Sequence, residues 1–443
     1  MKYLLFLFVG LAATGCLEVQ NPYSALPPGK YRGVLRLEPK MARNVHEPVN
    51  ILVPEFSDLK YDEVTNGELP FGMEVIYNEA GTEFHIELIN GEERIRVDDI
   101  AFGWDRQLTK DTLILNFPVY DTYVTALTEG GVIEGDWVVN YKQNYRIPFV
   151  AMYGEDYRFT QLQKPPVTDL SGTWAVEFSP DDDPYAAVGE FQQEGNRVTG
   201  TFRTETGDYR FLEGEIQADK LYLSVFDGSH AFLFEAKVAE NEMVGTFRSG
   251  KHYRTIWTAR RDANATLPSA DSLTYLNPGY DAVDFSFPLP DGGTLSPNNP
   301  EFAGKPKLVQ IMGTWCPNCR DETNFLRDYR AKHPEQDFEI MAIAFERYRD
   351  PARSMAALRT YGEQMNVDYP IALGGYYDKG EAGKALPMLN HVLSYPTLLF
   401  LDAENRVRHI HTGFSGPATS TWAEFQTEFE QRMRELTTAP ADS

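Results

Sequence analysis

The sequence feature that most limits the fold is a pair of cysteines in Cys316-Pro317-Asn318-Cys319, which directly follows an apolar run over residues 307–313. Cysteines separated by two residues can form a disulfide across the first turn of a helix with little strain. A thiol at a helix N-terminus has a lowered pKa because the helix dipole stabilises the thiolate. The pattern therefore predicts a buried strand followed by a helix, with a dithiol where the two meet.

Other uses of a cysteine pair fit the sequence less well. A zinc site needs four nitrogen or sulfur ligands, whereas the chain has three cysteines and eight scattered histidines, so we expect no metal. A c-type haem needs a histidine after the second cysteine, where Arg320 stands. A structural disulfide remains an alternative, but closing so short a loop adds little stability. We therefore predict thiol–disulfide exchange, with Cys316 as the attacking thiolate and Cys319 as the resolving thiol.

Strands and helices alternate after this point in the chain. Helices are expected at 317–333, 351–365 and 421–436, and strands at 338–345, 398–401 and 407–411. Alternating strands and helices are typical of an α/β layout around a central sheet.

Several residues before and after the cysteines occur together in a known family. They are Gly304-Lys305-Pro306, Trp315, Glu322 and Ser394-Tyr395-Pro396-Thr397. With the two cysteines, they make residues 281–440 similar to the thioredoxin-fold domain of exported thiol-disulfide oxidoreductases of the TlpA/ResA type. The resemblance implies a cis bond before Pro396, which would face Cys316. It also implies that Trp315, Tyr395, Pro396 and Thr397 bind the substrate, and that no organic cofactor is needed.

Glu322 lies three residues after Cys319 and therefore on the same face of the expected helix. The resemblance implies a catalytic role, in which Glu322 exchanges a proton with Cys319. The alternative is a carboxylate that merely complements the helix dipole. Gln310 stands where thioredoxin has a buried aspartate, so that position supplies no general base. Tyr395 before the proline departs from the family and leaves the direction of electron flow open.

The first half of the chain has a different pattern, with short runs that alternate apolar and polar residues over 29–163 and again over 169–261. Alternation with period two predicts half-buried antiparallel strands. Gly172-Thr173-Trp174 resembles Gly29-Lys30-Tyr31, and other positions match in the same order. We therefore predict two related all-β units, barrel-like or sandwich-like, followed by a linker at 262–280 and the thioredoxin-like α/β domain.

The N-terminus has a lysine, a short apolar run and small residues before Cys16, which is typical of an export signal. Residues 13–16 resemble a bacterial lipobox, which implies cleavage after residue 15, a lipid on Cys16 and a tether over 16–28. Leu17 after the cysteine favours sorting to the outer membrane. The alternative is a plain signal peptide with an incidental cysteine.

Net charge excludes one class of partner. The chain has 41 basic and 65 acidic residues, a formal charge of −24, which argues against nucleic-acid binding. The sequence predicts a lipid-anchored envelope enzyme that reduces disulfides in exported proteins and receives electrons from another thiol protein. Two alternatives remain. One is a thiol peroxidase, although the peroxiredoxin motif has a proline and a threonine where this chain has Val309 and Gly313. The other is a β-domain lipoprotein that binds a ligand or partner, with an accessory redox domain.

Overall fold

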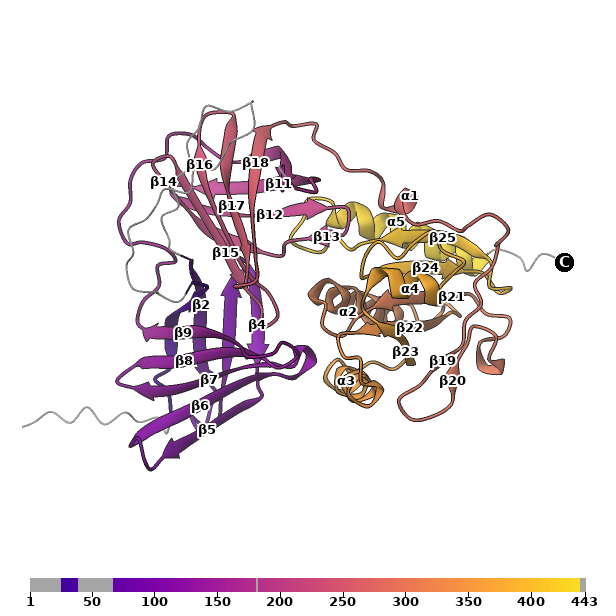
Figure 1. Ribbon diagram of the computed structural model, residues 1–443, viewed down its shortest axis with the longest axis horizontal. Coiled ribbons are helices and arrows are strands. Elements are labelled where there is room, and N and C mark those ends of the chain that lie inside the picture. Colours follow the sequence, from indigo (N-terminus) through magenta and orange to yellow (C-terminus); the bar gives the residue numbers. More distant parts are fainter. Residues whose placement is uncertain (1–24, 39–66, 181, 439–443) are drawn as a thin grey trace, which may run out of the picture.

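The computed structural model describes residues 25–38, 67–180 and 182–438. Two β units occupy the first half of the chain, and an α/β unit occupies the second half (Figure 1). The expected signal peptide at 1–15, Cys16 and most of the expected tether lie outside the described residues. Over the ranges that are described, no helix has both the length and the apolar character needed to span a membrane.

The first β unit is one antiparallel sheet in the order β4-β3-β2-β1-β9-β8-β7-β6-β5. The strands are β1 (Gly29–Arg36), β2 (Glu68–Tyr77), β3 (Phe84–Asn90), β4 (Glu93–Val97), β5 (Ile100–Asp105), β6 (Lys110–Phe117), β7 (Thr122–Glu129), β8 (Val132–Val139) and β9 (Tyr145–Tyr153). Burial alternates along β7, so one face is a core and the other faces outward. The sheet curls without closing, because β4 and β5 are its two edges.

The second β unit is a closed barrel. Its strands are β10 (Gly172–Phe178), β11 (Tyr185–Glu194), β12 (Arg197–Thr204), β13 (Gly207–Asp208), β14 (Leu212–Gln217), β15 (Lys220–Phe226), β16 (Ala231–Val238), β17 (Glu242–Ser249) and β18 (Tyr253–Arg261). Pairing of β11 with β12 closes the ring, and the two-residue β13 extends from its rim. Phe178, Phe202, Phe234 and Trp257 are all buried and in mutual contact, so aromatic rings fill the interior.

The two β units share one strand plan, in agreement with the predicted duplication. In each unit the first strand pairs with both the second and the last, as β1 does with β2 and β9 and β10 does with β11 and β18. Gly135 in β8 and Gly245 in β17 occupy the same place in the two plans. A Cβ at either position would overlap a carbonyl oxygen of the neighbouring strand, so both positions require glycine.

The β units also contact each other through a shared core. Phe226 from the end of β15 packs in the core of the first unit. Its carbonyl accepts a hydrogen bond of 2.9 Å from the buried Asn90 side chain. Arg158 adds bonds to Ser224 and, at 3.0 Å, to Glu213 of the barrel. These buried polar contacts indicate that the two units hold a fixed orientation relative to each other.

The C-terminal unit is a sheet in the order β23-β22-β21-β24-β25. Its strands are β21 (Lys307–Met312), β22 (Glu339–Glu346), β23 (Ile371–Tyr376), β24 (Thr397–Leu401) and β25 (Val407–Thr412), and its helices are α2 (Pro317–Lys332), α3 (Pro351–Gln364), α4 (Lys379–Ala385) and α5 (Trp422–Thr438). Central strand β21 runs parallel to β22 and antiparallel to β24. α2 and α5 pack through Phe325, whose ring contacts Trp422 and Phe429. This is the predicted thioredoxin-like α/β layout.

The segment predicted as a linker is not free along its whole length. It contains α1 (Ala270–Leu273), which is capped by Ser269. Asp271 on α1 lies 3.0 Å from His409 and 3.0 Å from His411, which share one face of β25. Asp271 also contacts Arg432 on α5. The second half of the segment is therefore fixed to the C-terminal unit, a contact between residues far apart in sequence that local composition does not indicate.

Candidate active site

Cys316 is the N-cap of α2, as the sequence predicts, and Pro317 occupies the first helical position. The backbone N–H of Cys319 donates a hydrogen bond of 3.2 Å to the Cys316 sulfur. Both cysteines are free thiols; Cys316 is 6% exposed and Cys319 is fully buried. The N-terminal end of the helix therefore stabilises a negative charge on Cys316 and not on Cys319.

The loop before β24 faces this thiol. The Tyr395–Pro396 bond is cis, as expected from the family resemblance. The carbonyl of Tyr395 lies 3.3 Å from the Cys316 sulfur. Thr397 donates a hydrogen bond of 2.9 Å to the Ser394 carbonyl and closes the loop. The geometry brings these residues to the dithiol, while their role in substrate binding stays a prediction.

Trp315 lies in an aromatic group beside the dithiol. Its indole N–H donates a hydrogen bond of 3.0 Å to the Phe345 carbonyl. The rings of Tyr377 and Tyr395 each lie 5.7 Å from the indole in edge-to-face contact. The hydrogen bond and the flanking rings fix the orientation of the indole next to Cys316.

Glu322 is fully buried behind Cys319. One carboxylate oxygen accepts a hydrogen bond of 2.9 Å from Gln310, and the other has no partner among the described residues. Burial raises the pKa of Glu322 to about 8. Burial, and then the neighbouring Cys316, raise the pKa of the Cys319 thiol well above its usual value. A carboxyl group that changes charge near neutral pH beside a buried thiol is suited to proton exchange.

Gln310 connects the two groups. Its amide donates to Glu322 and, at 3.2 Å, to the Cys319 carbonyl. Its own carbonyl accepts a hydrogen bond of 3.1 Å from Thr323, which in turn accepts one of 2.8 Å from Tyr361 on α3. Gln310 therefore stands in place of the buried aspartate of thioredoxin, and its side chain positions the Glu322 carboxylate of α2.

Glu346 is a second buried carboxylate that the sequence analysis missed. It ends β22 and accepts two hydrogen bonds of 2.9 Å from Thr314, one from the backbone and one from the hydroxyl. Burial raises the pKa of Glu346 to about 7. The sequence contains one signal for Glu346: an acidic residue that directly follows the apolar run of the expected strand 338–345. Glu346 fixes the residue that precedes Trp315.

The β units cover the dithiol face. From the barrel, Ser229 donates a hydrogen bond of 3.2 Å to the Trp315 carbonyl. The Thr206 carbonyl, in the turn before β13, accepts a hydrogen bond of 2.8 Å from the Ser394 hydroxyl. Asn318, between the two cysteines, donates one of 3.2 Å to the Asp208 carbonyl. In this arrangement the barrel occupies the approach to Cys316.

A buried arginine joins the three units. Arg210 follows β13, and its side chain is 4% exposed. It forms ion pairs with Asp321 on α2, Glu93 on β4 and, at 3.7 Å, Asp227 after β15. Its pKa is raised well above the usual value by these carboxylates, against the effect of burial, so Arg210 remains charged. Removing one member would leave buried charges without a partner.

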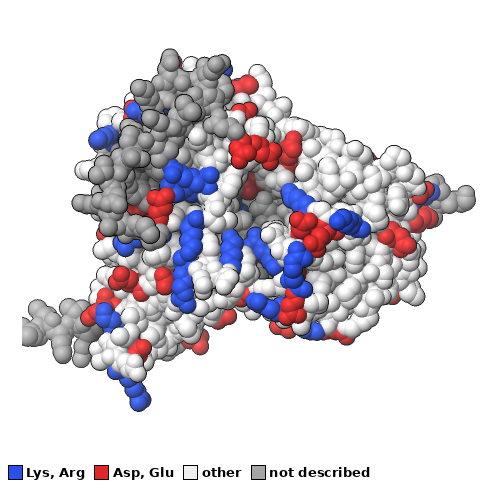
Figure 2. All heavy atoms as spheres, viewed as in Figure 1, with Lys and Arg blue, Asp and Glu red and all other residues white. Residues whose placement is uncertain are grey.

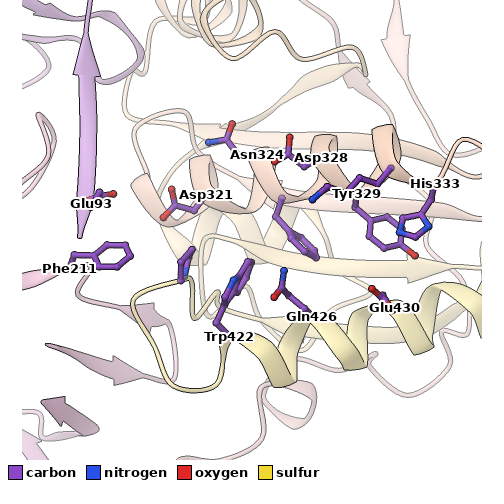
Figure 3. A pocket seen from close by; sticks show the side chains of 13 residues that line it. Glu93, Phe211, Asp321, Asn324, Asp328, Tyr329, His333, Trp422, Gln426 and Glu430 are labelled. Carbon is purple, nitrogen blue, oxygen red and sulfur yellow. The ribbon is translucent and has the colours of Figure 1, made fainter. Parts of the chain in front are cut away.

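A pocket of about 310 Å³ lies beside this junction, between α2, α5 and the barrel (Figure 3). Figure 3 shows Glu93 and Phe211 from the β units near Asp321, with Trp422 and Gln426 of α5 below. No cysteine lines this pocket, so it is separate from the dithiol. Across the described ranges, no group of three or more His, Cys, Asp or Glu residues is arranged to hold a metal ion.

A dithiol at a helix N-terminus, opposite a cis-proline loop on a mixed sheet, defines the C-terminal unit as a thioredoxin-like thiol-disulfide oxidoreductase domain. More specifically, residues 277–424 match the model of the Redoxin family.

Curated relatives include proteins from Bacillus species. The chain is 25% identical over 135 residues to the thioredoxin-like protein YneN of Bacillus subtilis, covering 30% of this chain and 71% of YneN. It is 26% identical over 107 residues to the thiol-disulfide oxidoreductase ResA of Bacillus cereus, covering 24% of this chain and 54% of ResA. The chain thus spans about half the length of ResA.

Among solved structures, the chain is similar to a thiol-disulfide oxidoreductase from Bacteroides fragilis, with 18% identity and a TM-score of 0.26. That match covers 34% of this chain and 99% of the other. A thiol:disulfide interchange protein from Chlorobium tepidum is 19% identical with a TM-score of 0.27, covering 35% of this chain and 95% of the other.

Proposed function

We propose that this protein reduces disulfides in exported proteins at the cell envelope by dithiol exchange. The observation that carries the proposal is the Cys316 thiol at the N-terminus of α2, 3.3 Å from the carbonyl that precedes the cis-proline. A substrate segment that pairs with the backbone of Tyr395 would bring its disulfide within reach of this sulfur.

In the first step, the Cys316 thiolate attacks one sulfur of the substrate disulfide. A mixed disulfide forms between the enzyme and the substrate, and the second substrate sulfur leaves as a thiolate. In the second step, Cys319 loses its proton to Glu322 and attacks the Cys316 sulfur. The bond between Cys316 and the first substrate sulfur breaks, and that sulfur leaves as a thiolate. The enzyme then holds a Cys316–Cys319 disulfide, and the substrate has gained two electrons.

Strong thiol oxidants owe their potential to a reduced form that is stabilised as a thiolate. Burial raises the pKa of Cys319 well above its usual value, so this thiol contributes no thiolate of that kind. The direction of electron flow is therefore decided by the midpoint potential of the couple.

The envelope location rests on the leader. Residues 1–16 support export and lipidation of Cys16, and Leu17 supports sorting to the outer membrane. In that compartment the enzyme would receive electrons from another thiol protein. For the β units we propose a covering role. The aromatic side chains that fill the barrel support this role and give no support to the alternative of a ligand held inside it.

The test is the midpoint potential of the Cys316–Cys319 couple, equilibrated against dithiothreitol and glutathione buffers and followed by the fluorescence of Trp315. A value near about −270 mV, as in thioredoxin, is the expected result. A value above about −180 mV would contradict a reductase and indicate an isomerase or an oxidant. Reduction of insulin by the wild type and not by Cys316→Ser assigns the turnover to this dithiol.

A further inference from the structure

A group of basic side chains gathers beside Trp315, where three loops meet. Lys142 comes from the β8–β9 turn, Lys251 and His252 come from the β17–β18 turn, and Arg347 follows β22. The Lys142 ammonium nitrogen lies 3.2 Å from a His252 ring nitrogen. The Arg347 guanidinium lies 4.1 Å from the centre of the Trp315 ring. We refer to these four residues as the basic group.

Among the described residues, Lys142, Lys251 and Arg347 form no ion pair with a carboxylate. In the described part of the chain, Lys142 and Lys251 each lie 4.7 Å from the centre of the Tyr145 ring, and Lys251 also donates to a backbone carbonyl. Arg347 lies between the rings of Trp315 and Tyr141, at 4.1 and 4.4 Å. In a chain with a net charge of −24, three neighbouring cations that pair with no carboxylate of the described ranges are an unusual arrangement. Figure 2 shows Lys and Arg side chains gathered near the seam between the β units and the C-terminal unit.

Nearby carboxylates are already engaged. Glu346 accepts both hydrogen bonds of Thr314 and faces away from solvent. Asp121 contacts the Tyr348 hydroxyl and lies 3.7 Å from Arg353. The repulsion inside the basic group is visible in Lys142, whose pKa is lowered to about 8 by burial and by Arg347. An incoming anion would relieve this repulsion.

A pocket of about 220 Å³ adjoins the basic group through Arg347, and Tyr141, Trp315, Asp121 and Glu346 also line it. Lys142 and Lys251 lie outside its lining. This volume is below the range of sites for drug-sized ligands and fits one or two amino-acid side chains. Cations drawn from separate loops, with tyrosine and tryptophan rings between them, suit an extended polypeptide that carries several carboxylates. The pocket adjoins the residue directly before Cys316.

We propose that Lys142, Lys251 and Arg347 bind an acidic segment of the substrate protein, next to the disulfide that Cys316 attacks. This inference rests on the proposed function and names the class of substrate. The site selects substrates by charge, because a glutamate or aspartate near the disulfide neutralises the basic group as the disulfide approaches the thiol.

The test uses the full chain and two disulfide-linked fluorescent peptide pairs that differ in charge. One pair carries glutamates on both sides of its cysteines, and the other carries glutamines. At low salt we expect kcat/KM to be roughly tenfold higher for the glutamate pair. The double variant Lys142→Ala/Lys251→Ala should lose most of this preference. Lys110→Ala, which removes a surface cation on the edge hairpin of the first sheet, should keep it.

A binding measurement separates this inference from the proposed function. The probe is the glutamate peptide with its cysteine replaced by serine, followed by fluorescence anisotropy. Its affinity should fall when salt rises from about 0.05 to about 0.5 M, because the shorter Debye length screens the cations. If the peptide binds in this way but neither disulfide pair is reduced, the proposed function fails and the site stands.

Three results would overturn the inference. They are equal kcat/KM for the two pairs in the wild type, an unchanged preference in the double variant, and displacement of the peptide by inorganic phosphate at the same concentration as by free glutamate peptide. The third result would indicate a small-anion site. The charge-reversal variant Lys142→Glu is the control for loss of folding. If it is folded, it should bind a peptide with lysines in place of the glutamates better than the wild type does.

Discussion

Two buried carboxylates, Glu322 and Glu346, belong to the surroundings of the dithiol, and burial raises the pKa of both. They differ in what they contact. Glu322 lies behind Cys319 with one oxygen free of protein partners in the described structure, so it is available to take a proton. Glu346 uses both oxygens to hold Thr314, so it positions a neighbour of the dithiol.

Glu322→Gln should lower the turnover number roughly tenfold to hundredfold at pH 8 or above, because the proton acceptor for Cys319 is lost. In the wild type, the rate of the resolving step should rise with pH through about 8, where Glu322 ionises. That inflection should vanish in the variant. Single-turnover kinetics of mixed-disulfide resolution measure it, and an unchanged pH profile would remove Glu322 from the mechanism.

The same substitution should affect stability with a defined sign. The pKa of Glu322 is higher in the folded chain, at about 8, than the usual carboxyl value, so folding binds a proton more tightly. The wild type therefore loses stability as pH rises from about 4.5 to about 8. Glu322→Gln carries no such proton and should show a flatter dependence in thermal melts between these values. A parallel dependence in both proteins would contradict the burial of this carboxyl group.

Part of the residue-level site could be predicted. The spacing of Cys316 and Cys319 indicates the dithiol, because helix geometry is local. Glu322 follows from the same helix periodicity, but its burial does not, since that depends on which residues of the sheet lie beside α2, such as Gln310 of β21. Glu346 was missed because its effect arises where β22 meets the loop after β21, and single-strand patterns contain no information about neighbours.

At the level of elements, the loop from β21 into α2 is held from two sides. Thr314 is bound by Glu346 from β22, and Trp315 is bound by the Phe345 carbonyl of the same strand. The end of β22 therefore fixes the two residues that lead into the dithiol.

The fluorescence of Trp315 should change with pH around 7, as Glu346 ionises beside Thr314. Glu346→Gln should remove this transition, because the amide does not ionise. A Trp315→Phe variant supplies the background from the other tryptophans. Persistence of the same transition in Glu346→Gln would assign it to another group.

The strand plan of the β units was partly predictable. Alternating residues indicate antiparallel strands, and the repeated Gly-x-aromatic pattern indicates duplication. Closure of the second unit and the open edges of the first were not predictable. They depend on whether one pair of consecutive strands bonds: β11 pairs with β12, whereas β4 and β5 follow each other in the chain and form the two edges of the first sheet. The alternating pattern within each strand is the same in both cases.

For the whole molecule, the important interface is the one between the barrel and the C-terminal unit. Arg210 contacts Asp321 and Glu93, residues 111 and 117 positions away in the chain. Sequence motifs and hydrophobic periodicity do not indicate contacts between residues so far apart in the chain. The sequence therefore predicts the three units but not that one of them covers the dithiol.

Arg210→Ala should increase the rate at which iodoacetamide alkylates Cys316, because the buried carboxylates of Glu93 and Asp321 lose their partner and the interface weakens. Breaking a buried ion pair typically costs about 3–5 kcal/mol, so we expect a rise of at least about tenfold. Tandem mass spectrometry of the peptide that contains both cysteines separates the reaction of Cys316 from that of Cys319.

Arg197→Ala is the control, since Arg197 is a half-exposed arginine that pairs with Glu213 of the same β unit. It should leave the alkylation rate unchanged. If Arg210→Ala stays folded and alkylates at the wild-type rate, the ion pairs do not hold the cover in place.

The turn before β13 has one more consequence. Its Thr206 carbonyl already accepts the hydrogen bond that Ser394 offers, beside the groove where an extended substrate would lie. A substrate that pairs with the backbone of Tyr395, as proposed above, would bind only the fraction of molecules in which this turn has moved away. Its apparent dissociation constant equals the intrinsic one divided by that fraction. If one molecule in about a hundred is open, affinity appears about a hundredfold weaker, and any ligand that prefers the open form accelerates turnover without contacting either sulfur.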